Sequence, residues 1–341
     1  MRRIFPILLA GFLLAALPLS CSAPSKGEEV SFTAMDTAMT GRFYGKDAKQ
    51  AAEAYQQEIA DLEQLWSKTI SSSDVSRLNQ SGSLKKEALD PRTVSLLRRS
   101  MEISELTGGS FDPVLGRLVS LWGIGTEQEK VPEADELVSA SKESGAEHLS
   151  EKDGSFTLSG NAQLDLGGIS KGAATDEIRQ SLSGLSLDGY LLSLGGNIYV
   201  SGEKPDQSEW KIGISDPGGE SAYLGYLSVS DCAVITSGDY ERFFVRDGIR
   251  YHHILDRATG SPAQSGLRSV TVVSKDAALA DALSTALFVM GAEKGLAFCG
   301  QQPDAEAVFV TDDGFVYLTD GLKECFTLTE EARYTIKDGE K

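Results

Sequence analysis

The stretch LDLGGISKGAATDEIRQSL, residues 164–182, decides the fold. Its first three residues alternate apolar and polar side chains, which is typical of a strand, and the glycine pair that follows predicts a turn. Residues 171–182 then predict a helix. A strand that leads into a helix through two glycines indicates a protein of mixed strands and helices, and the flanking sequence indicates how they are combined.

Helices and strands alternate irregularly on both sides of this stretch. Residues 47–67 predict an amphipathic helix, and residues 276–290 predict a buried helix because they are apolar nearly all round and end at Gly291. Strands are expected at 29–44, 189–201, 209–215, 222–230, 242–255, 270–274, 307–310 and 314–318. Since no regular strand–helix–strand rhythm is present, the predicted fold class is α+β, with mixed sheets and flanking helices.

The composition limits the classes of function. The chain has 341 residues, of which 41% are hydrophobic and 24% charged, as expected for a soluble protein with a packed core. Its 50 acidic and 32 basic side chains give a net charge of −18, which disfavours binding to DNA or RNA. With three histidines in the chain, a bound metal is better explained by oxygen ligands than by a His-rich zinc site.

The N-terminus has the layout of an export signal. Two arginines precede an apolar run that ends before Cys21, and this run is too short to span a membrane comfortably. The sequence around Cys21 resembles a bacterial lipoprotein cleavage site, which would anchor the protein on the exported side of the inner membrane. We expect a signal peptide over 1–20, a lipid-anchored tether over 21–30, one domain over 31–330 and a polar tail over 331–341. Cleavage nearby with release of the protein is the alternative.

The other cysteines, Cys232, Cys299 and Cys325, contain no CxxC pair. They therefore provide neither a redox motif nor a zinc knuckle, and at most one disulfide can form among them. We expect them to be small core residues without a chemical role.

A carboxylate inside an apolar helix carries the most specific chemical signal. Asp281 and Thr285 are four residues apart in the expected buried helix, so they share one face. A buried charge needs a partner because its removal from water is costly, and no Lys or Arg lies nearby on this helix. Carboxylate, hydroxyl and carbonyl oxygens suit Mg²⁺ bound together with phosphates. A distant Lys or Arg as the partner of Asp281 is the alternative.

The glycine turn of residues 164–172 suits an anion. Free N–H groups at a helix N-terminus, the helix dipole and the Lys171 ammonium group together favour a phosphate. Gly168 to Gly172 formally matches G-x-S-x-G, but the polar strand before it and the missing HGGG-type segment argue against a hydrolase nucleophile. The Walker A spacing is also absent. A tight turn with a solvated lysine is the alternative.

Two other segments are chemically suggestive. Phe111 follows a glycine pair and offers a ring for stacking, although a helix end followed by an Asp-Pro turn is the simpler interpretation of that segment. His252 and His253 are adjacent near the end of an expected strand, so their side chains point to opposite faces and one at most faces a given site. A site histidine and an ordinary surface or core histidine stay equally open.

Six segments together resemble the ApbE family of periplasmic flavin transferases (FAD:protein FMN transferases). They are, in chain order, TGGSFDP (107–113), LDLGGISKG (164–172), SLGGNIYVSG (193–202), TSGDYERFF (236–244), HILDRATGSP (253–262) and DALSTA (281–286). The resemblance runs from Met35 to about Gly291. It implies an α+β fold with FAD in a deep cleft and Mg²⁺ bridging the FAD diphosphate to the protein.

The matching positions imply roles for individual residues. His253, which begins HILD, matches the catalytic histidine of the family. The implied FAD-binding residues are Met35, Ser110, Phe111, Asp112, Asp165, Lys171 and Ile254, and the implied metal ligands are Asp281, Thr285 and backbone oxygens of Gly168 and Ser284. The chain differs from the family at Asp36, where glycine is usual, near Thr69, where an aromatic residue is expected to pack on the flavin, and at Arg257, where proline is usual.

The resemblance implies a Mg²⁺-dependent FAD:protein FMN transferase. Such an enzyme attaches FMN through a phosphoester to a Thr or Ser of an acceptor flavoprotein and releases AMP. Subunits of membrane redox pumps are among the acceptors that the family suggests. Two alternatives stay open: a metal-dependent FAD diphosphatase, if water attacks in place of the acceptor, and a lipid-anchored flavin-binding protein without catalytic activity.

Overall fold

The computed structural model describes residues 27–337. The expected signal peptide, the lipid-anchor residue Cys21 and most of the expected tether lie outside the described residues, and so do residues 338–341. Within the described part of the chain, every helix is too short or too polar to cross a bilayer.

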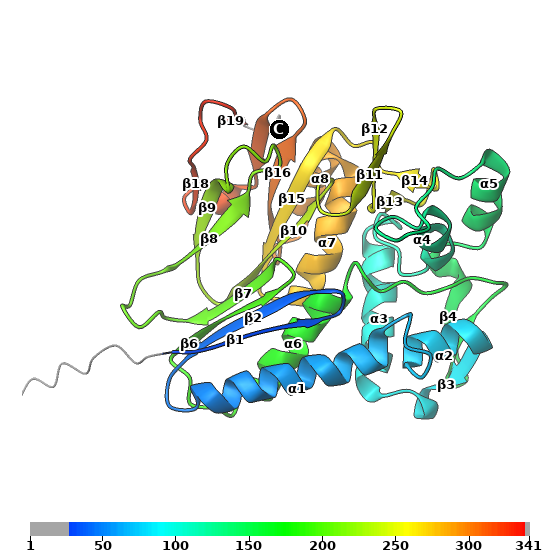
Figure 1. Ribbon diagram of the computed structural model, residues 1–341, viewed down its shortest axis with the longest axis horizontal. Coiled ribbons are helices and arrows are strands. Elements are labelled where there is room, and N and C mark those ends of the chain that lie inside the picture. Colours follow the sequence, from blue (N-terminus) through cyan, green and yellow to red (C-terminus); the bar gives the residue numbers. More distant parts are fainter. Residues whose placement is uncertain (1–26, 338–341) are drawn as a thin grey trace, which may run out of the picture.

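The described residues form helices and strands in mixed order (Figure 1). The α-helices are α1 Ala48–Trp66, α2 Asp74–Ser81, α3 Pro91–Leu106, α4 Gly116–Trp122, α5 Ala134–Lys142, α6 Ser170–Leu182, α7 Ala277–Met290 and α8 Ala292–Cys299. The large sheet contains β1 Glu28–Ala34, β2 Thr37–Tyr44, β6 Gly189–Leu194, β7 Asn197–Gly202, β10 Cys232–Gly238, β15 Leu267–Ser274, β16 Glu306–Thr311, β17 Phe315–Leu318 and β19 Thr335–Lys337. The smaller sheets contain β8 Trp210–Ser215, β9 Tyr223–Val229 and β18 Phe326–Leu328; β3 Ser83–Lys85, β4 Leu149–Lys152 and β5 Ser155–Leu158; β11 Phe243–Arg246 and β12 Ile249–His252; β13 Leu255–Asp256 and β14 Ser261–Pro262.

The large sheet is the centre of the molecule. Its nine strands run in the order β1-β2-β6-β7-β10-β15-β16-β17-β19, and all neighbours are antiparallel except β17 and β19. Helices α1, α6 and α7 pack on one face of this sheet and bury the largest apolar cluster against it. The β8–β9–β18 sheet covers part of the other face and buries a second cluster. This arrangement confirms the predicted α+β class.

Two predicted helices are confirmed. The four-and-three spacing of α1 buries Tyr55, Ile59, Leu62 and Trp66 on one face, as the sequence pattern requires. Helix α7 packs against β10 and β15 of the sheet and against α6 and α8, so it is buried on nearly all sides, and its apolar surface is required throughout.

Residues 164–166, predicted to be a strand, are in no sheet. The Leu164 N–H and C=O are bonded to the side chain of Asn79 at 2.7 and 3.1 Å, and the Asp165 N–H donates to the Pro113 carbonyl. Since the backbone polar groups of Leu164 and the Asp165 N–H are satisfied locally, this segment needs no neighbouring strand. The helix prediction that followed it is confirmed by α6.

Three predicted strands are hairpins in the structure. The segment 29–44 turns at Met35 and Asp36, which have φ of 48° and 57°, and the segment 189–201 turns at Gly195 and Gly196. The segment 242–255 forms β11, a turn, β12 and β13. Each turn needs positive φ at two residues. The alternation of apolar and polar side chains continues through the turn, so this pattern alone does not reveal where the strand reverses.

The chain ends and the cysteines differ in part from expectation. Strand β1 begins at Glu28, inside the expected tether, and the expected polar tail contains β19 and the buried Tyr334. Cys232 and Cys299 are buried, whereas Cys325 is partly exposed, and all three are free thiols.

Candidate active site

The N-terminus of α6 and the middle of α7 meet around one buried carboxylate. Asp281 is 4% exposed, and its two oxygens accept hydrogen bonds from the Gly172 N–H at 2.8 Å and the Asn197 side-chain amide at 2.9 Å. Both donors are neutral, so within the described residues Asp281 is held without the ion pair that was the alternative. Because neither donor carries a charge, the negative charge of Asp281 is not neutralised and can attract a cation.

A group of hydroxyls lies beside Asp281. The Ser237 hydroxyl of β10 lies 2.7 Å from that of Ser284 and 3.4 Å from that of Thr285. A Cβ placed on Gly168 would lie 3.4 Å from the Thr285 hydroxyl, so the glycine turn before α6 faces this group directly. The structure therefore brings together the four residues expected to hold the metal.

Phe111 forms part of the same cluster but is 2% exposed. Its ring would lie 3.4 Å from a Cβ on Gly168, which places it under the glycine turn. Little of the ring is available for stacking, so the sequence-based idea of a stacking platform is not supported by its burial. Its neighbour Ser110 is half-buried, and the Ser110 N–H donates to the Thr107 carbonyl.

Asp112, in the segment 107–113, is held by several contacts. Its fully buried carboxylate accepts hydrogen bonds from the Val114 and Ala146 N–H groups, and the Arg257 guanidinium lies 3.6 Å away. Burial raises the pKa of Asp112, and these three contacts act against that rise. Arg257 also pairs with Glu147. The arginine at the position where the family has proline therefore ties the 107–113 segment to its surroundings.

Asp165 has a partner that the sequence did not reveal. The Lys68 ammonium lies 2.5 Å from the Asp165 carboxylate, and the Gly167 N–H donates to the same side chain. Burial alone would raise the pKa of Asp165, but Lys68, Gly167 and the nearby Arg242 together lower it below its usual value. Lys68 is next to Thr69, the position near which the family suggests a flavin-stacking aromatic residue. Lys68 therefore places a positive charge beside this position.

The two adjacent histidines have different surroundings. His252 ends β12, is buried, bonds the Ala263 carbonyl through Nε2 at 3.1 Å and packs edge-on against Phe288. His253 follows the strand and is half-buried, and its N–H donates to the Arg242 carbonyl.

The charge state of His253 follows from its surroundings. Burial lowers the pKa of His253 to about 4, and the positive charges of Arg242 and Lys171 act in the same direction. The imidazole is therefore neutral at pH 7.

Glu241 and Arg242 also face this region, and the sequence analysis gave them no role. Burial raises the pKa of Glu241 to about 7, Lys171 and Arg242 act against that rise, and Asp281 adds to it. The Glu241 residue is nevertheless exposed to solvent. Both residues lie in the TSGDYERFF segment, so the polar turn itself was the available signal.

The remaining expected residues surround this cluster less directly. The Lys171 ammonium lies 3.4 Å from the Gly167 carbonyl, so it folds back over the glycine turn. Met35 lies in the β1–β2 turn, where its N–H donates to Glu63. Ile254 is 3% exposed and belongs to the core.

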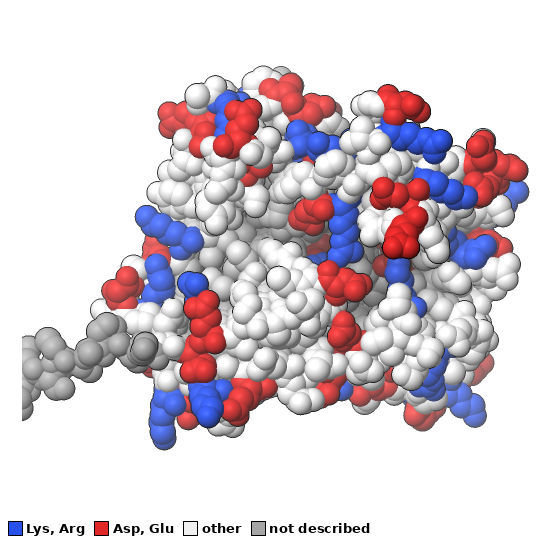
Figure 2. Space-filling view, viewed as in Figure 1, with Lys and Arg blue, Asp and Glu red and all other residues white. Residues whose placement is uncertain are grey.

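The surface above the cluster is hollowed and charged. In Figure 2, acidic and basic side chains gather in the middle of this face, over the region where Figure 1 shows α6 and α7 opposite α3 and α4. Among the described residues, no group of three or more His, Cys, Asp or Glu side chains could hold a metal. A metal here would therefore depend on hydroxyl and carbonyl oxygens together with Asp281.

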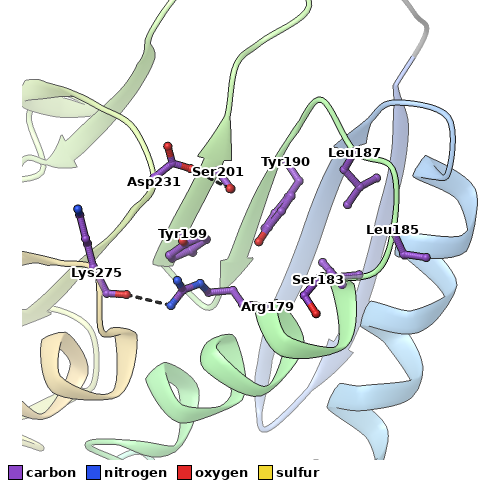
Figure 3. A pocket seen from close by; sticks show the side chains of 10 residues that line it. Arg179, Ser183, Leu185, Leu187, Tyr190, Tyr199, Ser201, Asp231 and Lys275 are labelled. Carbon is purple, nitrogen blue, oxygen red and sulfur yellow. Dashed lines mark hydrogen bonds between the residues drawn. The ribbon is translucent and has the colours of Figure 1, made fainter.

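A second cavity lies at the opposite end of α6. It has a volume of about 460 Å³ and opens between Tyr190, Tyr199, Arg179 and Lys275 (Figure 3). Arg179 is already bonded to Asp176 and to the Lys275 carbonyl, and it lies over the Tyr199 ring. None of the expected site residues lines this cavity, so we do not assign it to the active site.

The comparison with known proteins agrees with this geometry. The model of the ApbE family matches residues 35–309. The chain belongs to the ApbE family. A relative from Treponema pallidum named FAD:protein FMN transferase is 36% identical over 307 residues, covering 82% of this chain and 83% of the relative. A relative of the same name from Vibrio cholerae is 32% identical over 325 residues, covering 91% and 94%.

Solved ApbE structures share the fold. The ApbE protein of Thermotoga maritima is 34% identical with a TM-score of 0.81, covering 88% of this chain and 99% of its own. The flavinyl transferase ApbE of Pseudomonas stutzeri, in its apo form, is 31% identical with a TM-score of 0.78, covering 88% and 97%. The resemblance inferred from six segments is thereby confirmed at the level of the family and the fold.

Proposed function

We propose that this ApbE protein is a Mg²⁺-dependent FAD:protein FMN transferase. It moves FMN from FAD to a Thr or Ser hydroxyl of an acceptor flavoprotein and releases AMP. The observation that carries the proposal is the position of a buried carboxylate, Asp281, beside the glycine turn that precedes α6, with only neutral hydrogen-bond donors around it. The names of the related proteins support the same activity.

The donor set around Asp281 fits Mg²⁺. Asp281 and the Thr285 hydroxyl would hold the ion together with backbone oxygens of Gly168 and Ser284, because Mg²⁺ prefers hard oxygen ligands and shares them with phosphates. When bound, Mg²⁺ supplies neutralisation of the negative charge that develops on a diphosphate.

The residues of the α6 turn would bind the FAD diphosphate. The N-terminus of α6 presents the positive end of its helix dipole, and Lys171 adds an ammonium group. The Lys68–Asp165 ion pair and the 107–113 segment would hold the rest of FAD, with Ser110 and Asp112 as polar contacts. Met35 and Ile254 would contribute apolar contacts.

His253 would act as the general base. Its neutral imidazole accepts the proton of the acceptor hydroxyl, whose oxygen forms a bond to the phosphorus of the FMN half. The phosphoanhydride bond to the AMP half breaks, and AMP leaves with the electron pair. If water replaces the acceptor, the same groups hydrolyse FAD to FMN and AMP.

The location of this reaction in the cell is inferred from the N-terminal sequence. We propose a lipid anchor at Cys21 that holds the enzyme on the exported side of the bacterial inner membrane. Exported flavoproteins, such as subunits of membrane redox pumps, would be the acceptors within its reach.

AMP release from FAD tests the proposal. FAD is incubated with the protein, with and without Mg²⁺, and with and without an apo subunit of a membrane redox pump as acceptor. We expect AMP release that needs Mg²⁺, with one covalent flavin on the acceptor for each AMP. AMP without covalent flavin would indicate the diphosphatase, and FAD bound without AMP release would indicate the storage protein.

A variant at Asp281 tests the metal assignment separately. Asp281→Ala should abolish Mg²⁺-dependent turnover and the Mg²⁺-dependent gain in FAD affinity, measured by flavin fluorescence. Full activity of this variant at low Mg²⁺ would remove Asp281 from the metal site.

A further inference from the structure

Exposed apolar side chains gather on one hairpin. Among the described residues, seven large hydrophobic side chains are exposed, and three of them lie on β11–β12. Phe243 is 38%, Val245 59% and Ile249 54% exposed. The other four, Leu106, Val138, Tyr223 and Ile336, come from separate elements. Single exposed apolar residues are ordinary, but a concentration on eight strand residues indicates a contact surface.

The fold does not need these side chains for its own packing. In the register of β11–β12, Phe243 and Val245 lie on one face, whereas Ile249 lies on the other face with Phe244 and Tyr251. Phe244 and Tyr251 stack at 5.2 Å, and Tyr251 packs on Trp122 of α4. Those rings attach the hairpin to the molecule. Among the described residues neither strand pairs with a third strand, so both hairpin edges keep backbone groups that can bond an extended segment.

The hairpin leads directly to the proposed catalytic base. Strand β12 ends at His252, His253 follows, and the His253 N–H donates to the carbonyl of Arg242 next to β11. Val245 pairs with Arg250, which precedes His253 by three residues. At roughly 3.3 Å per strand residue, about three residues of an extended chain would reach from His253 to Val245.

The charge of the hairpin suits a partner that is not basic. Residues 241–250 contain three arginines and two acidic residues, Glu241 and Asp247, in a chain whose net charge is −18. Arg250 lies over the Phe243 ring at 4.3 Å and bonds Asp239, so it is partly engaged, while Arg246 at the tip is exposed. A local excess of positive charge favours an acidic partner segment.

We propose that the β11–β12 hairpin is the docking surface for the acceptor protein. An extended acceptor segment next to the modified Thr or Ser lies along the hairpin and places apolar side chains on Phe243 and Val245, which brings the hydroxyl to His253. This inference rests on the proposed function, because it concerns the second substrate of the same site.

Val245→Asp tests the docking surface, with Val138→Asp as its matched control. Val138 is the same residue type, is 55% exposed and lies on α5. The probe is the apo redox-pump subunit, and its KM in FMN transfer is measured alongside FAD affinity and AMP release without acceptor. We expect Val245→Asp to raise the acceptor KM at least about tenfold, a difference of about 1.4 kcal/mol, with FAD affinity and acceptor-free AMP release unchanged. Val138→Asp should behave as wild type.

Any of the following results would contradict the proposed docking surface. An unchanged acceptor KM in Val245→Asp overturns the docking surface while leaving the transferase intact. A wild-type dimer that Val245→Asp converts to a monomer, measured by light scattering, would show that the surface binds a second copy instead. Absence of transfer by wild type would overturn the proposed function, and this inference with it. If Val245→Asp does not fold, Val245→Ser replaces it, with Val138→Ser as its control.

Discussion

At the scale of single residues, His253 is the proposed catalytic base, and His252 packs in the core. Replacement of His253 by Ala removes the proposed general base, so we expect FMN transfer to fall by roughly 10²–10⁴-fold with FAD affinity nearly unchanged. His252 bonds Ala263 and packs against Phe288, so His252→Ala should lower the free energy of unfolding by about 1–3 kcal/mol and leave transfer mostly intact. Initial rates, flavin fluorescence and thermal melts measure these effects.

The reverse pattern would assign catalysis to the other histidine. If His252→Ala loses transfer while remaining folded, or if His253→Ala loses activity only through weaker FAD binding, His253 is not the base.

The protonation of His253 is itself measurable. Burial and the nearby cations lower its pKa to about 4, so the ring of the FAD-free protein should stay neutral from pH 8 to about pH 5 in a histidine NMR titration. The signal is assigned by its loss in His253→Asn. In the unfolded chain the pKa is near ~6.5, so between these values the unfolded state binds the extra proton and the free energy of unfolding falls as pH falls. A midpoint near 6.5 in the folded protein would contradict this placement.

Single residues were predictable where a motif marked them. Asp281 was predictable because it is a carboxylate inside an apolar helix, and its burial is confirmed. Its partners Gly172 and Asn197 lie 109 and 84 residues away, and Lys68 lies 97 residues from Asp165. Contacts at such separations depend on how the chain folds back, which residue spacing does not record.

Helices α6 and α7 meet at one glycine. A Cβ on Gly172 would lie 2.1 Å from the Ala277 carbonyl oxygen and 2.7 Å from Asp281 Cβ. Gly172→Ala should therefore force the helices apart, lower the free energy of unfolding by about 1–3 kcal/mol or more, and displace Asp281 from its N–H donor. Thermal melts and the Mg²⁺ dependence of FAD binding measure both effects.

Gly184→Ala is the control for Gly172→Ala. Gly184 follows the same helix, and a Cβ there would meet nothing within 4 Å, so the change in stability should stay within about 0.5 kcal/mol. Equal melting temperatures for the two variants would show that the helices tolerate separation.

Elements were predictable when one periodicity ran through them without interruption. Helix α1 repeats its apolar positions over five turns, and α7 is apolar on all sides, so both were found with nearly their observed bounds. The hairpins at Met35 and at Gly195 were read as single strands because their turns are two residues long. Residues 164–166 have the alternation of a strand, but the Asn79 side chain satisfies the Leu164 N–H and C=O.

At the scale of the whole molecule, the class of the fold was predictable but the strand order was not. Strand β2 pairs with β6, and β7 pairs with β10, although other elements separate each pair in the chain. Those pairings place α6 beside α7 and so create the site. Six motifs in family order implied an α+β fold with FAD in a deep cleft, but they did not indicate the strand order.

Anchoring should be separable from catalysis. The described fold begins at Gly27, six residues after Cys21, so the proposed anchor is not part of the cleft. We expect Cys21→Ser to lose fatty-acid labelling and membrane partitioning while the protein lacking residues 1–26 transfers FMN at the wild-type rate. A wild-type protein that incorporates no fatty acid and partitions into the aqueous phase would exclude the lipid anchor.

The intact mass of the acceptor after reaction tests the central claim most directly. The apo redox-pump subunit is incubated with FAD, Mg²⁺ and either wild-type protein or His253→Ala, and its mass is followed over time. The account predicts a gain of one FMN phosphoester at a Thr or Ser with wild type, in step with AMP, and a rate lower by roughly 10²–10⁴-fold with His253→Ala. An acceptor that stays unmodified with wild type while FAD is hydrolysed or merely bound would contradict it.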